Sequence, residues 1–299
     1  MSYTTEEIKK GIKLHLIDTN KFKTNLITVV ISMPLSREKV TLNTVIPAVL
    51  KRGTKNLKTQ EDISKKLEEM YGAEFDCGIE KIGDNHVLKF YLETLNDNFL
   101  PSDENQNLAK EGLDLLLDII LKPYLEEEAF KKEYVESEKE NIKLLIQSKI
   151  DNKASYALNR CIEEMYKDKP YGLYKFGYTE DLKNINEKNL YNQYKEILKT
   201  AKIDIMFSGN IEKDKIISYV KENENIINLQ DRKLQIITNT NKEIEQKEIK
   251  TIEEKMDVTQ GKLVIGMDVE SKNPDDKFKI SLYNVILRRR SNLKIISKC

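Results

Sequence analysis

The sequence predicts an α+β fold in which a mixed, largely antiparallel sheet carries packed helices. Strand-like runs come in neighbouring pairs, at residues 12–19 and 25–33 and again at residues 73–82 and 86–94, with helical patterns between and after them. Neighbouring strands joined by short turns pair antiparallel, whereas parallel strands need a long crossover. Pairs of strands that alternate with groups of helices are typical of the α+β class.

The composition indicates a helix-rich protein without a strong electrostatic preference. The 299 residues include 50 Lys or Arg and 50 Asp or Glu, so no bulk field favours nucleic acid or an acidic membrane. No apolar run approaches the roughly 20 residues that a bilayer requires, and the polar N-terminus is unlike a signal peptide. The three cysteines, Cys77, Cys161 and Cys299, are scattered, which favours reduced thiols in a cytoplasmic protein.

The first hundred residues predict two strands, two helices and a hairpin. A turn at residues 18–23 joins the strands, and a short apolar helix at residues 44–52 ends at Gly53. Thr59 is the expected N-cap of the next helix, which ends at Gly72. The sequence Gly83-Asp84-Asn85 then joins the two alternating runs into a β-hairpin.

The middle of the chain is predominantly helical. A strongly apolar helix at residues 113–121 stops at Pro123, and the charged residues 126–151 are expected to form one or two helices. In chain order we then expect a helix, a loop and two more helices, at residues 155–166, 170–177, 179–182 and 186–198.

The last third of the chain again places strands before helices. A buried-type strand at residues 203–207 precedes a helix at residues 213–222, and the polar residues 223–246 are expected to form a linker. A strand pair and a final helix follow, at residues 249–254, 262–269 and 278–287.

Four stretches, taken in order, carry a resemblance to a known family. They are residues 45–54 with the helix at 59–72, Phe130 followed by Glu138-Lys-Glu-Asn-Ile142, the loop Pro170-Tyr171-Gly172 with Gly177, Leu182 and Leu190, and the strand at 203–210. Together they resemble the insulinase/pitrilysin-type zinc peptidase superfamily, and within it the bacterial members that lack the metal site. The chain is similar to the group called elongation-factor-P 5-aminopentanol modification-associated protein.

The resemblance implies two similar α+β halves that close around an extended peptide. Residues 1–228 would form the first half, a peptidase-like domain with a degenerate metal site. Residues 229–299 would form a linker and the truncated beginning of the second half. Relatives of this kind are typically encoded beside an active paralogue, which would be the partner in a heterodimer.

The metal-binding positions of the superfamily are occupied here by residues that cannot bind a metal. Active members carry His-x-x-Glu-His on a helix, where the two His hold Zn²⁺ and the Glu is the general base. The same register reads Thr44, Pro47 and Ala48, and the third ligand, a Glu, aligns with Leu145. The resemblance therefore implies no catalytic residue, no metal and no cofactor.

Other chemistry is weakly supported. The chain has only two histidines, His15 and His86, each in a strand-like run. Cys77 and His86 share the predicted hairpin, but two ligands do not make the four that a structural zinc site needs. The basic triplet Arg288-Arg-Arg290 at a helix end favours interaction with the helix dipole over a nucleic-acid patch. Carboxylate pairs such as Glu68-Glu69 are expected on solvated helix faces, and no P-loop, Gly-x-Ser-x-Gly or dinucleotide-binding motif occurs.

The C-terminal residues suggest a frameshift. The superfamily continues here with a segment resembling Lys-Leu-Phe-Gln-Asn-Val-Arg. With A/T-rich codons, one added A converts that segment to Lys-Ile-Ile-Ser-Lys-Cys and a stop codon, which matches residues 294–299. We therefore hypothesise a frameshift at Lys294, which resequencing of the gene would test.

Three functions remain open from the sequence. The favoured one is a non-catalytic protein that binds an active paralogous peptidase subunit, or adds an extended peptide to a free edge of the predicted hairpin. The second is a zinc-dependent metalloendopeptidase, which requires ligands that the sequence lacks. The third is a truncated remnant with little function. Neither nucleic acid nor a membrane is expected as a partner.

Overall fold

The larger of two compact units, unit 1 (Met1–Ile146 and Lys175–Ile236), is built on a six-stranded mixed sheet. The computed structural model describes residues 2–101, 106–234, 248–267, 273, 275–288 and 294–296. The sheet has the order β1-β2-β8-β3-β5-β4. Its strands are β1 (Ser2–Lys9), β2 (Ile12–Asp18), β3 (Thr24–Pro34), β4 (Glu74–Ile82), β5 (Asn85–Leu95) and β8 (Lys202–Gly209). Among the described strands of this sheet, only β2 and β8 pair in parallel, so the predicted mixed, largely antiparallel sheet is confirmed.

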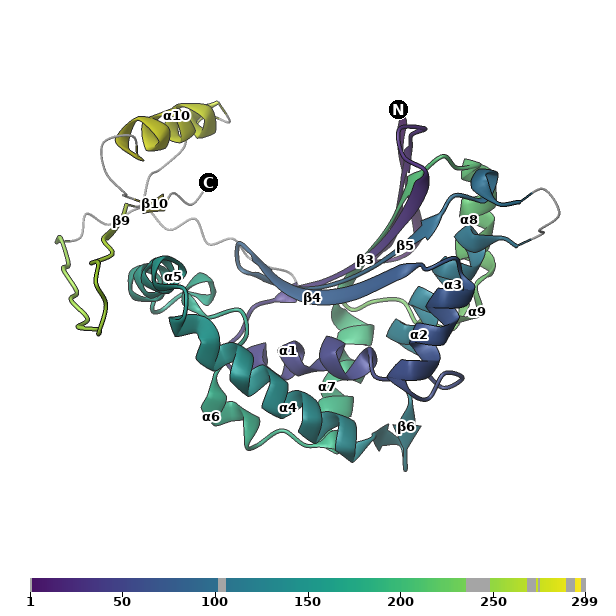
Figure 1. Ribbon diagram of the computed structural model, residues 1–299, viewed down its shortest axis with the longest axis horizontal. Coiled ribbons are helices and arrows are strands. Elements are labelled where there is room, and N and C mark those ends of the chain that lie inside the picture. The colour runs from purple at the N-terminus through teal and green to yellow at the C-terminus, as the bar shows by residue number, and fades with distance from the viewer. Residues whose placement is uncertain are drawn as a thin grey trace. The chain divides into compact units, whose positions relative to one another are not determined.

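Helices cover one face of this sheet (Figure 1). The helices of unit 1 are α1 (Val40–Leu50), α2 (Gln60–Glu69), α3 (Leu108–Leu121), α4 (Lys132–Gln147), α6 (Thr179–Leu182), α7 (Glu187–Thr200), α8 (Lys213–Glu222) and α9 (Glu224–Ile227). Alternate strand residues point toward them and are buried, as Ile12, Leu14 and Leu16 are on β2. The helix-facing halves of the strands therefore form the core with α1, α3 and α7.

Several local predictions are confirmed by the hydrogen bonds. The Thr59 hydroxyl accepts from the Asp62 N–H at 3.1 Å, and the Asp62 carboxylate accepts from the Thr59 N–H, which completes a capping box at α2. Strands β4 and β5 pair antiparallel up to Ile82 and Asn85. This leaves Gly83, at φ +56°, and Asp84 as the two-residue turn.

Other expectations were wrong. Residues 2–9, which carried no predicted element, form the edge strand β1. The helix expected from residue 126 is preceded by a small hairpin of β6 (Leu125–Glu126) and β7 (Ala129–Phe130). Its turn places Glu127 at φ +47° and Glu128 at φ +61°, a conformation that a helix excludes. The expected strand at residues 249–254 does not form.

The chain divides into two compact units. Unit 1 comprises Met1–Ile146 and Lys175–Ile236, and unit 2 comprises Gln147–Tyr174 and Ile237–Cys299. The predicted domain boundary after residue 228 stays a prediction. The linker residues 235–247, Arg289 and Arg290, and residues 297–299 lie outside the described part of the chain.

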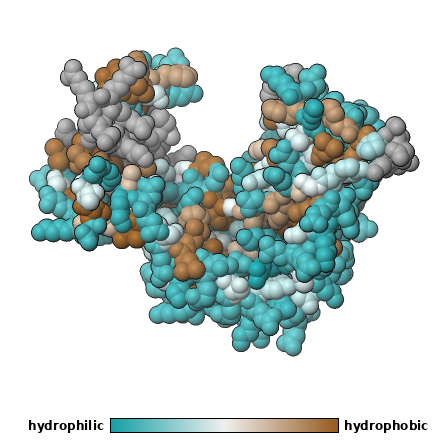
Figure 2. Space-filling view, viewed as in Figure 1, coloured by the Kyte–Doolittle hydropathy of each residue, from teal (hydrophilic) through white to brown (hydrophobic). Residues whose placement is uncertain are grey.

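Unit 2 contains α5 (Lys153–Met165), η3 (Pro170–Gly172), β9 (Val264–Gly266), α10 (Asp276–Arg288) and β10 (Lys294–Ile296). Helix α5 packs against β9, and Arg160 on α5 pairs with Glu254 at 2.7 Å. Figure 2 shows apolar surface over α10, where five large side chains are at least half exposed: Phe278, Leu282, Tyr283, Val285 and Ile286. Helix α10 therefore buries little of its apolar surface against the described residues.

Candidate functional site

The positions on α1 that were predicted to be a degenerate metal site are part of the packed interior. The Thr44 side chain is buried, and its hydroxyl donates to the carbonyl oxygen of Val40 at 2.9 Å and lies 3.2 Å from that of Lys175. Pro47 lies inside the helix and its carbonyl accepts from the Cys77 thiol at 3.4 Å. Ala48 packs against the core. The helix face that is predicted to align with the two histidines of active peptidases presents a hydroxyl engaged in hydrogen bonds and two apolar groups.

Lys175 connects helix α1 to the sheet through hydrogen bonds. Its carbonyl oxygen, besides meeting Thr44, accepts from Nε2 of His86 on β5 at 2.9 Å. Its ammonium group donates to the carbonyl of Ile79 on β4 at 3.3 Å. Two residues on, Gly177 has φ +78°, and a Cβ there would lie 2.2 Å from the Thr41 hydroxyl. Only glycine fits this approach, so the loop is fixed against α1.

His86 is a neutral hydrogen-bond donor. A carbonyl oxygen only accepts, so the bond to Lys175 assigns the proton of the neutral ring to Nε2. Burial lowers the pKa of His86 to about 4, because the charged ring would lose its water. With Nε2 engaged in this bond, the ring nitrogen that remains is Nδ1, which is buried and has no partner among the described residues.

Cys77 and His86 are not placed to share a metal ion. Cys77 pairs with Phe90 across the hairpin, and Phe90 is four residues from His86 along β5. At about 3.3 Å per residue the two side chains are separated by roughly 13 Å, whereas zinc bonds are about 2.0–2.3 Å long. Burial also raises the pKa of Cys77 to about 12, so its thiol stays protonated at neutral pH.

The helix expected to supply the third zinc ligand supplies no free carboxylate. Leu145 on α4 is 39% exposed and carries no oxygen. The buried carboxylate on this helix is Glu138, which pairs with Arg52 at 3.5 Å and accepts from Asn141 at 3.1 Å. Within the described ranges, no group of three or more His, Cys, Asp or Glu side chains is placed to hold a metal ion.

His15 belongs to a network that sequence reasoning missed. The hydroxyls of Tyr3 and Thr5 on β1 lie 2.8 and 3.1 Å from its Nδ1, and its Nε2 lies 2.9 Å from Asp204 on β8. Lys202 also pairs with Asp204 at 2.8 Å. Because these partners come from distant segments, only strand register brings them together. The network joins β1, β2 and β8.

Strand β4 is one edge of the sheet. It pairs only with β5, so among the described residues no strand covers its other side. The N–H of Cys77 bonds to the Asp76 carboxylate at 2.8 Å, and the C=O of Ile79 bonds to Lys175. Both groups therefore face away from β5, as alternate residues of an edge strand do. The edge is partly capped by two side chains of the same unit.

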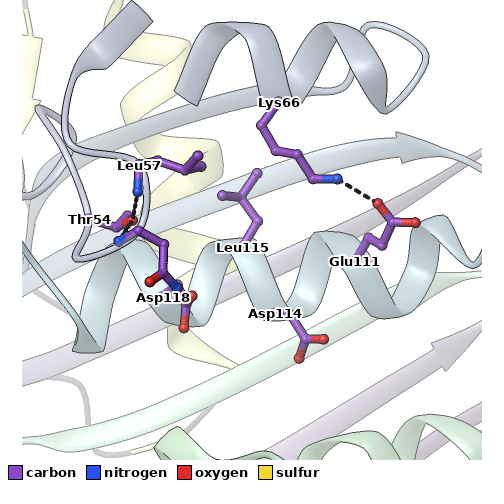
Figure 3. Close-up of a pocket in the computed structure, with 8 residues that line it drawn as sticks. Thr54, Leu57, Lys66, Glu111, Asp114, Leu115 and Asp118 are labelled. Atoms are coloured by element: carbon purple, nitrogen blue, oxygen red, sulfur yellow. Dashed lines mark hydrogen bonds and ion pairs between the residues drawn. The ribbon is translucent and has the colours of Figure 1, made fainter. Parts of the chain in front are cut away.

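A separate hollow lies between α2 and α3. It has a volume of about 270 Å³ and is lined by Thr54, Asn56, Leu57, Lys66, Glu111, Asp114, Leu115 and Asp118. Figure 3 shows Lys66 and Glu111 pointing toward each other, at 2.9 Å. Asp114 and Asp118 accept from Asn223 and Asn225 at 2.8 Å each. The charged groups around this hollow are therefore paired with one another or with neighbouring helices, and they stabilise the packing of those helices. The hollow contains none of the predicted site residues.

Comparison with known proteins identifies similar chains. The family described as the peptidase M16 inactive domain matches residues 184–297. The probable inactive metalloprotease YmfF of Bacillus subtilis (strain 168) is 32% identical over 268 residues, which cover 89% of this chain and 62% of that protein. The chain thus spans less than two thirds of the length of this relative.

Solved structures share the architecture. A conserved protein from Enterococcus faecalis V583 has a TM-score of 0.71 and 25% identity, over 77% of this chain and 53% of that one. Pitrilysin has a TM-score of 0.58 and 15% identity, over 76% of this chain and 23% of its own. A peptidase M16 inactive domain from Pseudomonas fluorescens has a TM-score of 0.59 and 14% identity, over 78% and 52%.

Proposed function

Because this chain belongs to the pitrilysin-like M16 peptidase family, we propose that it is a non-catalytic member that binds extended polypeptide along β4. One observation carries the proposal. The edge strand β4 packs beside α1, on which the predicted metal positions Thr44, Pro47 and Ala48 carry neither an imidazole nor a carboxylate for zinc. This combination supports a protein that holds a peptide without cleaving it.

Zinc hydrolysis needs three protein ligands and a base near an activated water. The Thr44 hydroxyl is already donated to backbone carbonyls, and Leu145 has no donor atom. Glu138 is neutralised by Arg52. These facts do not favour the alternative of a zinc endopeptidase, and the continuous core of unit 1 does not favour that of a truncated remnant with little function.

The side chains of β4 suggest which peptide binds. Residues of one strand face alternate to the two sides of the sheet. Glu74, Asp76 and Glu80 are exposed on one side, whereas Phe75 and Ile79 pack toward the helices on the other. Opposite charges across a strand pair stabilise it by about 0.2–1 kcal/mol each. A peptide with alternating basic and apolar residues therefore matches this edge.

The partner belongs to the same proposal. We propose that the chain associates with an active paralogous peptidase subunit in the cytoplasm, as a heterodimer. No helix in the described ranges is both long and apolar enough to cross a membrane. Co-purification with a paralogue that carries His-x-x-Glu-His is the expected result of a pull-down with the tagged chain.

The absence of catalysis is tested with zinc and peptide together. We expect the purified chain, equilibrated with Zn²⁺ and then desalted, to retain far less than one zinc per molecule and to leave peptides uncut. Stoichiometric zinc together with peptide cleavage would refute the non-catalytic assignment. Loss of both in Glu138→Gln, or in a variant of another carboxylate, would show that a side chain of this protein holds the metal.

Binding at the edge is tested by removing one N–H. Ile79→Pro deletes an N–H that faces away from β5, so it leaves the β4–β5 ladder intact but blocks strand addition. Ile79→Ala is the matched control, because it also loses the side chain but keeps the N–H. We expect a peptide of alternating Lys and Val to bind the Ala variant at least about tenfold more tightly than the Pro variant. Equal affinities would place the peptide elsewhere.

A further inference from the structure

Arg232 is a buried arginine at the opposite end of the sheet from β4. Its Nη1 donates to the carbonyl of Leu198, in the last turn of α7, at 2.9 Å. The next residue, Lys233, donates its N–H to the carbonyl of Lys199 at 3.0 Å. On the other side, a Cβ on Gly11, in the turn between β1 and β2, would lie 3.1 Å from Cδ of Arg232. Arg232 is thus clamped between a helix end and a strand turn, and it is 1% exposed.

Most of the hydrogen-bonding capacity of this guanidinium group is unused. Nε and Nη2 are both buried, and neither has a hydrogen-bond partner among the described residues. These two N–H groups lie side by side on one edge of the planar group and point the same way. That edge is the fork that grips a carboxylate or a phosphate with two parallel hydrogen bonds.

A buried cation with two unpaired donor groups is stabilised by a partner that accepts hydrogen bonds from them. Leaving charged donors without acceptors costs more free energy than a lost neutral hydrogen bond. Burial lowers the pKa of Arg232 to about 10, so the group remains a cation at neutral pH. No carboxylate of the described chain contributes to this environment, in which burial is the only perturbation of the guanidinium group.

The surrounding segments favour an anion. Lys10 belongs to the β1–β2 turn, Lys199 to the end of α7, and Lys233 directly follows the arginine, and all three are exposed. Asp231 and Leu234, on either side of Arg232 and Lys233 in the chain, are exposed as well. Cationic side chains on the segments next to a buried guanidinium group raise the local concentration of anions.

We propose that Arg232 is the centre of an oxyanion-binding site, which takes a carboxylate or a phosphate group on its Nε–Nη2 edge. The bound oxyanion completes the hydrogen bonding of the guanidinium group and links α7 to the β1–β2 turn. This site is independent of the β4 edge, because β1 and β4 are the two opposite edges of the sheet.

Thermal unfolding with single anions tests the site. A ligand at about 100 times its dissociation constant stabilises the native state enough to raise Tm by roughly 5 °C. We expect such a rise with sodium phosphate or sodium acetate, relative to sodium chloride at the same ionic strength. A rise with phosphate alone identifies a phosphate source, and a rise with acetate as well identifies a carboxylate source.

Two lysine variants give the matched comparison. Arg232→Lys keeps the charge but loses the planar fork, so the rise in Tm should be lost. Arg37→Lys is the control, because the Arg37 fork is already occupied by Asp181 at 2.6 and 3.2 Å, and it should retain the full rise. An anion response that survives in Arg232→Lys would overturn the proposal.

A spectroscopic measurement on the wild-type chain tests the site even if the variants do not fold. The Nε–H resonance of Arg232 in a ¹H–¹⁵N spectrum of the wild-type chain should shift on addition of the stabilising anion and saturate with the same dissociation constant. If neither phosphate nor acetate moves this resonance, or if chloride moves it equally, Arg232 is only a cap for the α7 carbonyls and the site does not exist.

Discussion

At the residue scale, Thr44 and His86 are held by the same backbone carbonyl, that of Lys175. Thr44 is predicted to align with a zinc ligand of active peptidases, and His86 is a histidine that could have been a ligand. Both instead donate hydrogen bonds that fix a loop to the helix and the sheet. Their chemistry is structural because every proton they offer is directed at a main-chain oxygen.

Thr44→Val removes this hydroxyl and keeps the shape of the side chain. We expect the free energy of unfolding to fall by about 1 kcal/mol, the typical net value of a buried hydrogen bond. Urea unfolding monitored by circular dichroism measures the change. Thr44→Ser, which keeps the hydroxyl and loses a methyl group, controls for packing. If the valine variant is as stable as wild type, the two hydrogen bonds contribute nothing.

His86 predicts a loss of stability in mild acid. Its pKa is about 4 in the folded chain against an ordinary value of 6.5, so between these values the unfolded chain binds more protons. The free energy of unfolding therefore falls as pH falls through this window, by about 2 kcal/mol between pH 7 and pH 5. His86→Gln keeps a donor for Lys175 but does not titrate. Urea unfolding midpoints at the two pH values should show the loss of stability due to His86 in the wild type and not in the variant. Equal losses in the two proteins would refute the assignment to His86.

At the element scale, β4 is an edge strand whose exposed main chain is partly occupied. Asp76 and Lys175 take one outward N–H and one outward C=O. Side-chain caps of this kind protect a sheet edge from pairing with other chains. An incoming peptide must displace them, so the same contacts that shield the edge also limit its affinity for peptide.

Lys175→Met should open this edge. Loss of the ammonium group frees the Ile79 carbonyl, and binding no longer has to break that hydrogen bond. We expect the peptide of alternating Lys and Val to bind about five- to tenfold more tightly, which corresponds to roughly 1 kcal/mol. Fluorescence anisotropy with a labelled peptide measures it. Lys21→Met, in the turn between β2 and β3, controls for the change in net charge. Unchanged or weaker binding in Lys175→Met would show that the cap is not on the binding edge.

At the scale of the whole molecule, the sheet depends on a late strand. β8, at residues 202–209, lies between β2 and β3 in the middle of the sheet. Its parallel pairing with β2 and antiparallel pairing with β3 join segments nearly 200 residues apart. Unit 1 therefore cannot complete its core until the chain has passed residue 209.

Two fragments test this dependence and the predicted domain boundary. A fragment of residues 1–234 retains all six strands and should unfold cooperatively, with a Tm within a few degrees of the full chain. A fragment of residues 1–201 lacks β8 and should show no cooperative transition. Differential scanning calorimetry distinguishes them. A cooperative transition in the shorter fragment would mean that β2 and β3 find another partner.

The small hairpin of β6 and β7 illustrates why some elements were not predictable. The run Glu126-Glu127-Glu128 has good helix propensity, so local pattern favours a helix there. In the fold, Phe130 packs edge-on to Tyr191 at 5.4 Å and to Tyr194 at 5.6 Å. Burying this ring against α7 requires a turn before it, and tertiary packing overrides the propensity of the glutamates.

The sequence by itself determined the α+β class, most helices and the β4–β5 hairpin, and it predicted the replacement of the metal-binding residues on α1. These features follow from periodicity, capping residues and turn residues, or from side-chain chemistry at a single position, all of which are local. Only the tertiary structure decided that β1 is a strand and that β4 is the free edge. It also decided which groups Lys175 and Arg232 contact. Those outcomes depend on contacts between residues far apart in the chain, and the free energy of such contacts is set by which segments are brought together rather than by any one of them.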